Sequence, residues 1–218
     1  MFCSKSCRDI GTKRYHQYEC AIMPLLINSS FYQVAFRLFL EFYDDYEHDM
    51  NELMGSVLEQ ENSNATIFDY DLSEKTSPRN AHRYKLSAIL GLNRTSKKWQ
   101  KQNFSVFFQD HPKMIEIWGT HQGFLSSFLH KLAQICQSNF HGIGTWALKK
   151  KPQKPYVRGK MSGHKRGMKF LGTGCFLFCS LLNHSCAPNV SRIFVDNKML
   201  IVVDRVIPSG GQLLDCYR

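Results

Sequence analysis

The stretch Ser180-Leu-Leu-Asn-His-Ser-Cys-Ala-Pro-Asn-Val190 decides how the rest of the chain is interpreted. Its two leucines are followed by a compact polar knot, which consists of Asn183, His184, Ser185 and Cys186. Pro188 then stops any helix. β-Branched residues follow, and the chain later reaches Gly211-Gln-Leu-Leu-Asp-Cys-Tyr217. Hydrogen-bond donors and acceptors are therefore concentrated where one element ends, which is where proteins often place binding residues. The sequence predicts a ligand site at this turn.

The run from Asn183 to Asn189, followed by an apolar segment that closes in Tyr217, resembles the signature of SET-domain protein lysine methyltransferases. The preceding Gly172-Thr-Gly-Cys-Phe176 is similar to the SET and MYND (SMYD) branch of that family. The alternative is a polar turn with a buried cysteine, but that would account for only one of these residues and not for the whole run. The resemblance implies an α+β fold, with small SET-type β-sheets around the Asn-His-Ser-Cys knot, a large helical insert and a partial MYND zinc finger.

The resemblance also implies an activity and its site residues. SET enzymes transfer a methyl group from S-adenosyl-L-methionine to a lysine amine of a protein, either histone or non-histone. Asn183 and His184 are expected to hold this cofactor, and Tyr217 is expected to be catalytic by orienting the amine and the methyl group. Since a free lysine has a pKa of about 10.4, the amine must lose its proton before it attacks.

Four residues near the start of the chain have the spacing of zinc ligands. Cys3 and Cys7 form a C-x3-C pair, and His16 and Cys20 form an H-x3-C pair. The members of each pair lie about one helical turn apart, so they can converge on zinc, which prefers tetrahedral nitrogen and sulfur coordination. The alternatives are incidental cysteines beside a histidine, or one site made from all four residues.

The same residues are similar to the second half of a MYND finger, in which Cys3 and Cys7 would serve one ion and His16 and Cys20 another. Each ion would then keep only half of its ligands. Because structural zinc affinity depends on a complete shell, we expect zinc to bind this chain weakly or not at all.

The resemblance divides the chain into residues 1–20 as the partial finger, 21–138 as the helical insert and 139–218 as the C-terminal half of the SET domain. The family's upstream Gly-x-Gly strand and its post-SET segment have no counterpart here, and Gln212 stands where an acid is common. The chain is therefore interpreted as a truncated form, and its own cofactor binding is expected to be poor.

Apolar side chains at i, i+3, i+4 and i+7 predict helices around residues 31–42 and 125–136. Short helices are expected around residues 84–90 and 112–118, where the pattern is weaker. The helix around residues 31–42 should begin at an N-cap within residues 28–30 and continue through an acidic, solvated face to Glu52. Residues 60–80 are polar and irregular, which predicts a loop.

A hairpin is expected after the polar knot. The β-branched segments Val190–Val195 and Lys198–Val203 flank Asp196-Asn197, and both turn residues tolerate positive φ. A last strand is expected to start at Leu213-Leu214 and to carry Tyr217.

The composition predicts a globular chain in a reducing compartment. The 218 residues are 43% hydrophobic, which suits one core, and the eight cysteines do not fit a small disulfide scaffold. Cys175, Cys179 and Cys186 could bind a metal, but core packing is the favoured interpretation. No segment approaches the roughly 20 apolar residues of a membrane span, so we expect no membrane partner and a cytoplasmic or nuclear location.

The net charge of +10 is concentrated in residues 149–169, which hold nine Lys or Arg and no acid. The rest of the chain is nearly neutral. Pro and Gly interrupt this segment and Tyr156 is its one aromatic residue, so a solvated insertion is favoured over a nucleic-acid interface. Nucleic acid is expected as a partner only through this loop.

Three functions remain open from the sequence. The leading one is a protein lysine N-methyltransferase with a lysine-containing protein substrate. The second is a catalytically inactive adaptor that binds protein partners through its MYND-like and helical surfaces. The third is a nucleic-acid-associated protein that uses the basic loop of residues 149–169.

Overall fold

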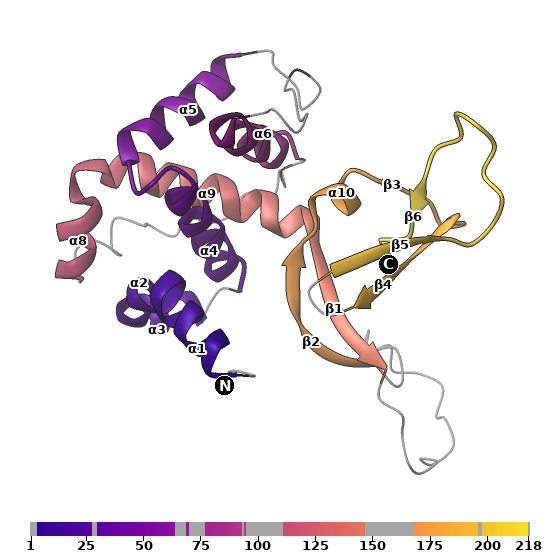
Figure 1. The fold of residues 1–218 in the computed structure, drawn as a ribbon, viewed down its shortest axis with the longest axis horizontal. Coiled ribbons are helices and arrows are strands. Elements are labelled where there is room, and N and C mark those ends of the chain that lie inside the picture. The colour runs from indigo at the N-terminus through magenta and orange to yellow at the C-terminus, as the bar shows by residue number, and fades with distance from the viewer. Residues whose placement is uncertain are drawn as a thin grey trace, which may run out of the picture. The chain divides into compact units, whose positions relative to one another are not determined.

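The structure is a computed structural model that describes residues 4–27, 30–63, 69, 77–92, 94, 111–146, 168–195 and 198–217. The chain forms two compact units, Met1–Asn139 and Phe140–Arg218. The described part of the first unit is helical, and the described strands all belong to the second (Figure 1). This combination confirms the α+β class. No helix in the described ranges has the length and apolar character needed to cross a membrane.

The first unit opens with a run of short helical segments. They are α1 (Lys5–Gly11), the π-helix η1 (Thr12–His16), α2 (Gln17–Glu19), the 3-10 helix η2 (Cys20–Ile22) and α3 (Met23–Ile27). Ser4 caps α1, because its hydroxyl accepts a 3.0 Å hydrogen bond from the backbone N–H of Cys7. The predicted N-cap at Asn28 and Ser29 lies outside the described residues.

The helices predicted around residues 31–42, 84–90, 112–118 and 125–136 are confirmed as α4 (Ser30–Asp45), α6 (Pro78–Leu90), α8 (Pro112–Trp118) and α9 (Gln122–Asn139). Helix α5 (Met50–Asn62) was not predicted as a separate helix, and the 3-10 helix η4 (Gly119–His121) precedes α9. The predicted loop over residues 60–80 is too wide at both ends, because α5 continues to Asn62 and α6 begins at Pro78. Ser77 caps α6 and Pro78 occupies its first turn, where a missing N–H costs nothing.

The predicted continuation of the first helix to Glu52 is wrong. Helix α4 ends at Asp45, and Glu47 and His48 then adopt positive φ values of 50° and 67°. Asp49 starts α5, because its carboxylate accepts hydrogen bonds from the backbone N–H groups of Asn51 and Glu52 at 2.8 and 3.0 Å. A strong N-cap thus divides a segment whose acidic residues suggested one solvated helix face.

The core of the first unit is aromatic and is centred on Trp118, which is fully buried. Its ring lies 5.3 to 6.0 Å from the rings of Tyr18, Phe36, Phe39 and Tyr43. The contacts with Phe36, Phe39 and Tyr43 are edge-to-face, and contacts of this kind add about 0.5–1.5 kcal/mol beyond burial. Helix α4, which packs against α9, supplies three of these four partners, so Trp118 anchors α8 to the pair.

The second unit contains three two-stranded sheets and the helix α10 (Leu177–Ser180). Strands β1 (Phe140–Trp146) and β2 (Met168–Cys175) are antiparallel, as are β4 (Val190–Val195) and β5 (Lys198–Val203). The short strands β3 (Asn183–His184) and β6 (Leu214–Asp215) are parallel. The predicted hairpin strands are confirmed, whereas the turn residues Asp196 and Asn197 lie outside the described residues.

The basic loop is shorter than predicted at its C-terminal end. Met168 and Lys169 belong to β2, where they pair with Trp146 and Thr145. Pairing with β1 satisfies the backbone hydrogen bonds of this end of the segment, whose glycine-rich sequence gave no signal for a strand. The remainder, residues 149–167, lies outside the described residues.

Candidate active site

The parallel pair of β3 and β6 forms the centre of the candidate site. In its register Asn183 lies opposite Leu214 and His184 lies opposite Asp215. The backbone N–H of Ser185 continues the pairing by donating to the carbonyl oxygen of Asp215 at 2.8 Å. The predicted cofactor residues and the segment that carries the predicted catalytic tyrosine are therefore held side by side.

Tyr217 contacts His184 of the polar knot and Leu182, the residue that precedes the knot. Its backbone N–H donates to Nδ1 of His184 at 3.1 Å, and its hydroxyl donates to the carbonyl oxygen of Leu182. The rings of His184 and Tyr217 lie 5.1 Å apart at 46°. Because Nδ1 accepts a hydrogen bond, a neutral His184 carries its proton on Nε2, which lies 3.5 Å from Sγ of Cys186.

The three predicted site residues face solvent. Asn183 and His184 are exposed, and Tyr217 is 58% exposed. Partial desolvation, followed by the negative charges of Asp215 and Cys179, raises the pKa of the Tyr217 phenol. The phenol is therefore protonated at neutral pH and acts as a hydrogen-bond donor. A group in this state can orient a polar substrate atom, but it does not serve as a base.

Asn189 fixes the segment that leads to Tyr217. Its buried side chain donates from Nδ2 to the carbonyl oxygen of Gln212 at 2.9 Å and accepts from the backbone N–H of Leu214 at 2.7 Å. Arg192, on β4, adds a third contact by donating to the carbonyl oxygen of Cys216 at 2.8 Å. Asn189 is the last residue of the motif from Asn183 to Asn189, whereas the sequence gave no signal for Arg192, which is one residue of an ordinary strand.

A known protein family matches most of this sequence. The SET domain profile matches residues 48–218. This chain belongs to the SET domain family. The match begins within the helical unit and continues through β6, so the SET region includes α5, α6, α8 and α9 as well as the sheets.

Curated SET proteins show a short similarity to this chain. The protein-lysine N-methyltransferase SMYD4 of Pongo abelii and that of Homo sapiens are 45% identical to it over 47 residues, and the Gallus gallus protein is 43% identical over the same length. The shared segment covers 22% of this chain and 6% of each relative. The assignment to the SET family is confirmed, and the short similarity to SMYD4 agrees with the SMYD branch. No solved structure matches the chain significantly.

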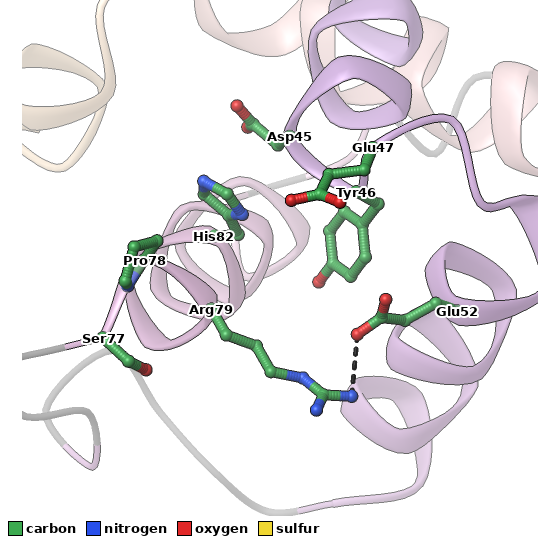
Figure 2. Close-up of a pocket in the computed structure, with 8 residues that line it drawn as sticks. All are labelled: Asp45, Tyr46, Glu47, Glu52, Ser77, Pro78, Arg79 and His82. Carbon is green, nitrogen blue, oxygen red and sulfur yellow. Dashed lines mark ion pairs between the residues drawn. The ribbon is translucent and has the colours of Figure 1, made fainter.

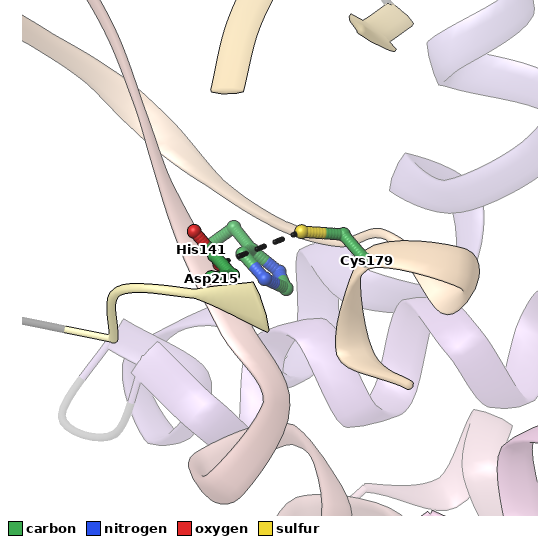
Figure 3. Close-up of side chains that lie close together, drawn as sticks. All are labelled: His141, Cys179 and Asp215. Atoms are coloured by element: carbon green, nitrogen blue, oxygen red, sulfur yellow. Dashed lines mark hydrogen bonds between the residues drawn. The ribbon is translucent and has the colours of Figure 1, made fainter. Parts of the chain in front are cut away.

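A buried polar cluster lies within the second unit of this SET protein. His141 on β1, Cys179 on α10 and Asp215 on β6 are 7%, 3% and 2% exposed, and their side chains converge (Figure 3). Burial and then the charge of Asp215 raise the pKa of the Cys179 thiol to about 11, with Sγ 3.9 Å from Oδ2 of Asp215. Sequence reasoning expected Cys179 in the core, but it singled out neither His141 nor Asp215.

The predicted zinc ligands are partly described. Cys3 lies outside the described residues, and Cys7, His16 and Cys20 are exposed on α1, η1 and η2. Across the described ranges, groups of three or more side chains that could hold a metal reduce to His141, Cys179 and Asp215. Zinc binding by the four N-terminal residues therefore stays a prediction.

A separate hollow of about 390 Å³ lies in the first unit, between the α4–α5 turn and the start of α6 (Figure 2). Its lining includes Asp45, Glu47 and Glu52 together with Arg79 and His82. Arg79 pairs with Glu52 at 2.7 Å, and Lys85 pairs with Asp45 at 2.6 Å. These ion pairs already compensate two of the three carboxylates, and none of the predicted site residues lines the hollow.

Proposed function

We propose that this chain is the catalytic part of an S-adenosylmethionine-dependent protein lysine N-methyltransferase of the SET and MYND group. The pairing of β3 with β6 carries the proposal, because it brings His184 into contact with Tyr217 from a distant part of the sequence. The printed names of the SMYD4 relatives, which are protein-lysine N-methyltransferases, agree with this activity. The substrate is a lysine-containing protein.

The polar knot has the chemistry that S-adenosylmethionine requires. This cofactor presents a purine, a ribose and an amino acid, all of which need hydrogen-bond donors and acceptors. The Asn183 side chain is exposed, and β3 has β6 as its one strand neighbour in the described sheet. The other edge of β3 therefore leaves the main-chain groups of His184 for a ligand, while Asn183 offers its side chain. When bound, the cofactor supplies an electrophilic methyl group on sulfur.

The residues of the chain then act by positioning. The Tyr217 phenol donates its proton to a carbonyl oxygen in this structure, so its oxygen can accept a hydrogen bond from an N–H of the substrate amine and orient it, while the nitrogen lone pair stays free to attack. Its neighbour His184 fixes the backbone of Tyr217, so cofactor binding and alignment of the amine use one connected structure. Alignment of the reacting atoms at roughly 3–3.5 Å accounts for much of the rate of such a transfer.

The experiment measures cofactor binding by calorimetry and methyl transfer to a pool of lysine peptides. It is run on this chain and on the longest protein that contains it. The proposal expects saturable binding and transfer to lysine in the longer form, with an unreactive lysine-to-arginine pool as the control. If the longer form is folded but shows neither binding nor transfer, the non-catalytic adaptor replaces this proposal.

A further inference from the structure

The cluster of His141, Cys179 and Asp215 contains three different ligand types from three segments of the chain. Its imidazole nitrogen, thiol sulfur and carboxylate oxygen all lie within 4.8 Å of one another. Figure 3 shows the side chains pointing toward a common region from β1, α10 and β6. The three side chains meet because they lie on the facing sides of β1, α10 and β6, and not because of their spacing in the sequence.

We propose that these three side chains bind one divalent transition-metal ion of the Zn²⁺ type, at a site distinct from the predicted cofactor residues. Imidazole, thiolate and carboxylate are the three protein ligands that zinc uses. Zinc bonds of about 2.0–2.3 Å place tetrahedral ligand atoms roughly 3.3–3.8 Å apart. Sγ of Cys179 and Oδ2 of Asp215 already lie 3.9 Å apart, so this pair needs only a small contraction, and the other pairs lie within 4.8 Å.

Burial and charge are suited to such an ion. A dication bound by a thiolate and a carboxylate forms a neutral unit, which removes most of the cost of burying the charges. Binding releases the thiol proton of Cys179 to solvent and forms a bond between sulfur and the metal, with no change in oxidation state. Three protein ligands leave a fourth position for water.

Arg192 opposes the ion and gives the proposal a specific signature. Its Nη1 lies 3.4 Å from Oδ2 of Asp215, while Nη2 is held by the carbonyl oxygen of Cys216 at 2.8 Å. The guanidinium is thus anchored beside the carboxylate, and it lowers the attraction of Asp215 for another cation. Replacing Arg192 with an uncharged residue should therefore tighten metal binding. If the three side chains formed only a structural hydrogen-bond network, the same substitution would not produce metal binding.

The proposal does not depend on methyl transfer, since the ion would act as a fixed link between β1, α10 and β6. These elements include the strand that leads directly to Tyr217. Metal bound here should stabilise the folded second unit by mass action in proportion to the logarithm of the free ion concentration.

The test uses the metal-free, reduced full chain and titrates it with Co²⁺, whose thiolate complexes absorb in the near ultraviolet. We expect one Co²⁺ whose thiolate band is lost in Cys179→Ser and weakened at least tenfold in affinity in His141→Ala. Cys175→Ser, which removes a nearby cysteine outside the cluster, should keep the band. A Cys7→Ser and Cys20→Ser background removes one ligand from each of the two predicted N-terminal pairs.

Two further measurements guard against misfolded variants. Zn²⁺ should raise the melting temperature of the wild type but not of Asp215→Asn, and circular dichroism reports whether each variant is folded. Arg192→Met should bind Co²⁺ about tenfold more tightly than the wild type. The proposal is overturned if folded wild type in the Cys7 and Cys20 background binds no Co²⁺, or if folded Cys179→Ser keeps the band.

Discussion

The backbone N–H of Tyr217 donates a hydrogen bond to Nδ1 of His184 at 3.1 Å. This bond joins the predicted catalytic residue to a predicted cofactor residue, and it uses the main chain rather than the phenol of Tyr217. The phenol itself donates to the carbonyl oxygen of Leu182. A change at the phenol can therefore be made without breaking the link that holds the two segments together.

Substitutions at Asn183 and Tyr217 should separate binding from turnover. Asn183→Ala removes a group that is proposed to contact the cofactor in the ground state and the transition state alike, so it should weaken cofactor affinity about tenfold, as expected for loss of a hydrogen bond. Tyr217→Phe should keep cofactor affinity and lower kcat by about 100-fold. Calorimetry and single-turnover rates on the active form distinguish the two effects.

The control for this pair is the stability of each variant. Because both side chains are exposed, neither change should lower the free energy of unfolding by more than about 1 kcal/mol. If Tyr217→Phe retains the wild-type kcat, the phenol has no role in the reaction and the assignment of Tyr217 as catalytic fails.

Asn189 should be important for stability rather than for chemistry. Asn189→Ala leaves the carbonyl of Gln212 and the N–H of Leu214 without their side-chain partner, so it should lower the free energy of unfolding by about 2–3 kcal/mol. Asn189→Asp keeps the acceptor for Leu214 but loses the donor to Gln212, so it should fall between alanine and wild type. Urea unfolding measures the stability of both variants. Equal stability of Asn189→Ala and the wild type would contradict a stabilising role for the two Asn189 hydrogen bonds.

The ion pair of Glu19 and Arg37 links α2 to α4 through two hydrogen bonds of 2.6 and 2.9 Å. Glu19 is buried, with its side chain 1% exposed, whereas the Arg37 side chain is 47% exposed. Arg37→Met leaves a buried carboxylate without its partner, so it should cost about 1–3 kcal/mol. The double variant with Glu19→Gln should be more stable than Arg37→Met alone, and thermal unfolding tests that order.

Tyr15 should make the first unit sensitive to alkaline pH. Burial, and then the hydrogen bond and charge of Glu41, raise the pKa of this phenol to about 12. In the unfolded chain the phenol ionises at about 10, so its contribution is complete below pH 10 and declines as the pH rises from 10 to 12. Tyr15→Phe should reduce the loss of stability in that window, and an unchanged pH dependence would exclude the effect.

The turn between α4 and α5 offers a stabilising substitution. Glu47 is exposed and adopts φ of 50°, a conformation that costs a residue with a Cβ roughly 1 kcal/mol and costs glycine little. Glu47→Gly should raise the free energy of unfolding by about 0.5–1 kcal/mol. Glu47→Ala keeps the Cβ and serves as the matched control. A gain of equal size in both variants would trace the effect to the lost carboxylate.

The sequence predicted the parts of this chain whose signals are local. The helices follow from apolar repeats, and the β4–β5 hairpin follows from β-branched segments around a turn. The break between α4 and α5 was missed, because the capping strength of Asp49 outweighed an acidic pattern that looks continuous. The candidate site residues were singled out only because their whole motif resembles a known family, and their roles stay predictions.

The rest depends on contacts between distant residues. Strands β1 and β2 carry glycines at Gly142, Gly144, Gly172 and Gly174, which weaken any strand signal, and their pairing supplies what the sequence hides. The convergence of His141, Cys179 and Asp215 likewise depends on three separate elements. No spacing rule connects a residue at the start of β1 with one in β6.

The parallel pairing of β3 with β6 also bears on how the chain folds. Asn183 can meet Leu214 only after the intervening residues are closed into a loop, and closing such a loop costs conformational entropy before it returns any contact. The β4–β5 hairpin lies inside that loop and forms from neighbouring residues, so its early formation shortens the free chain that remains to be closed. His184 and Tyr217 therefore meet only after that loop has closed, and slowing hairpin formation should delay assembly of the whole site.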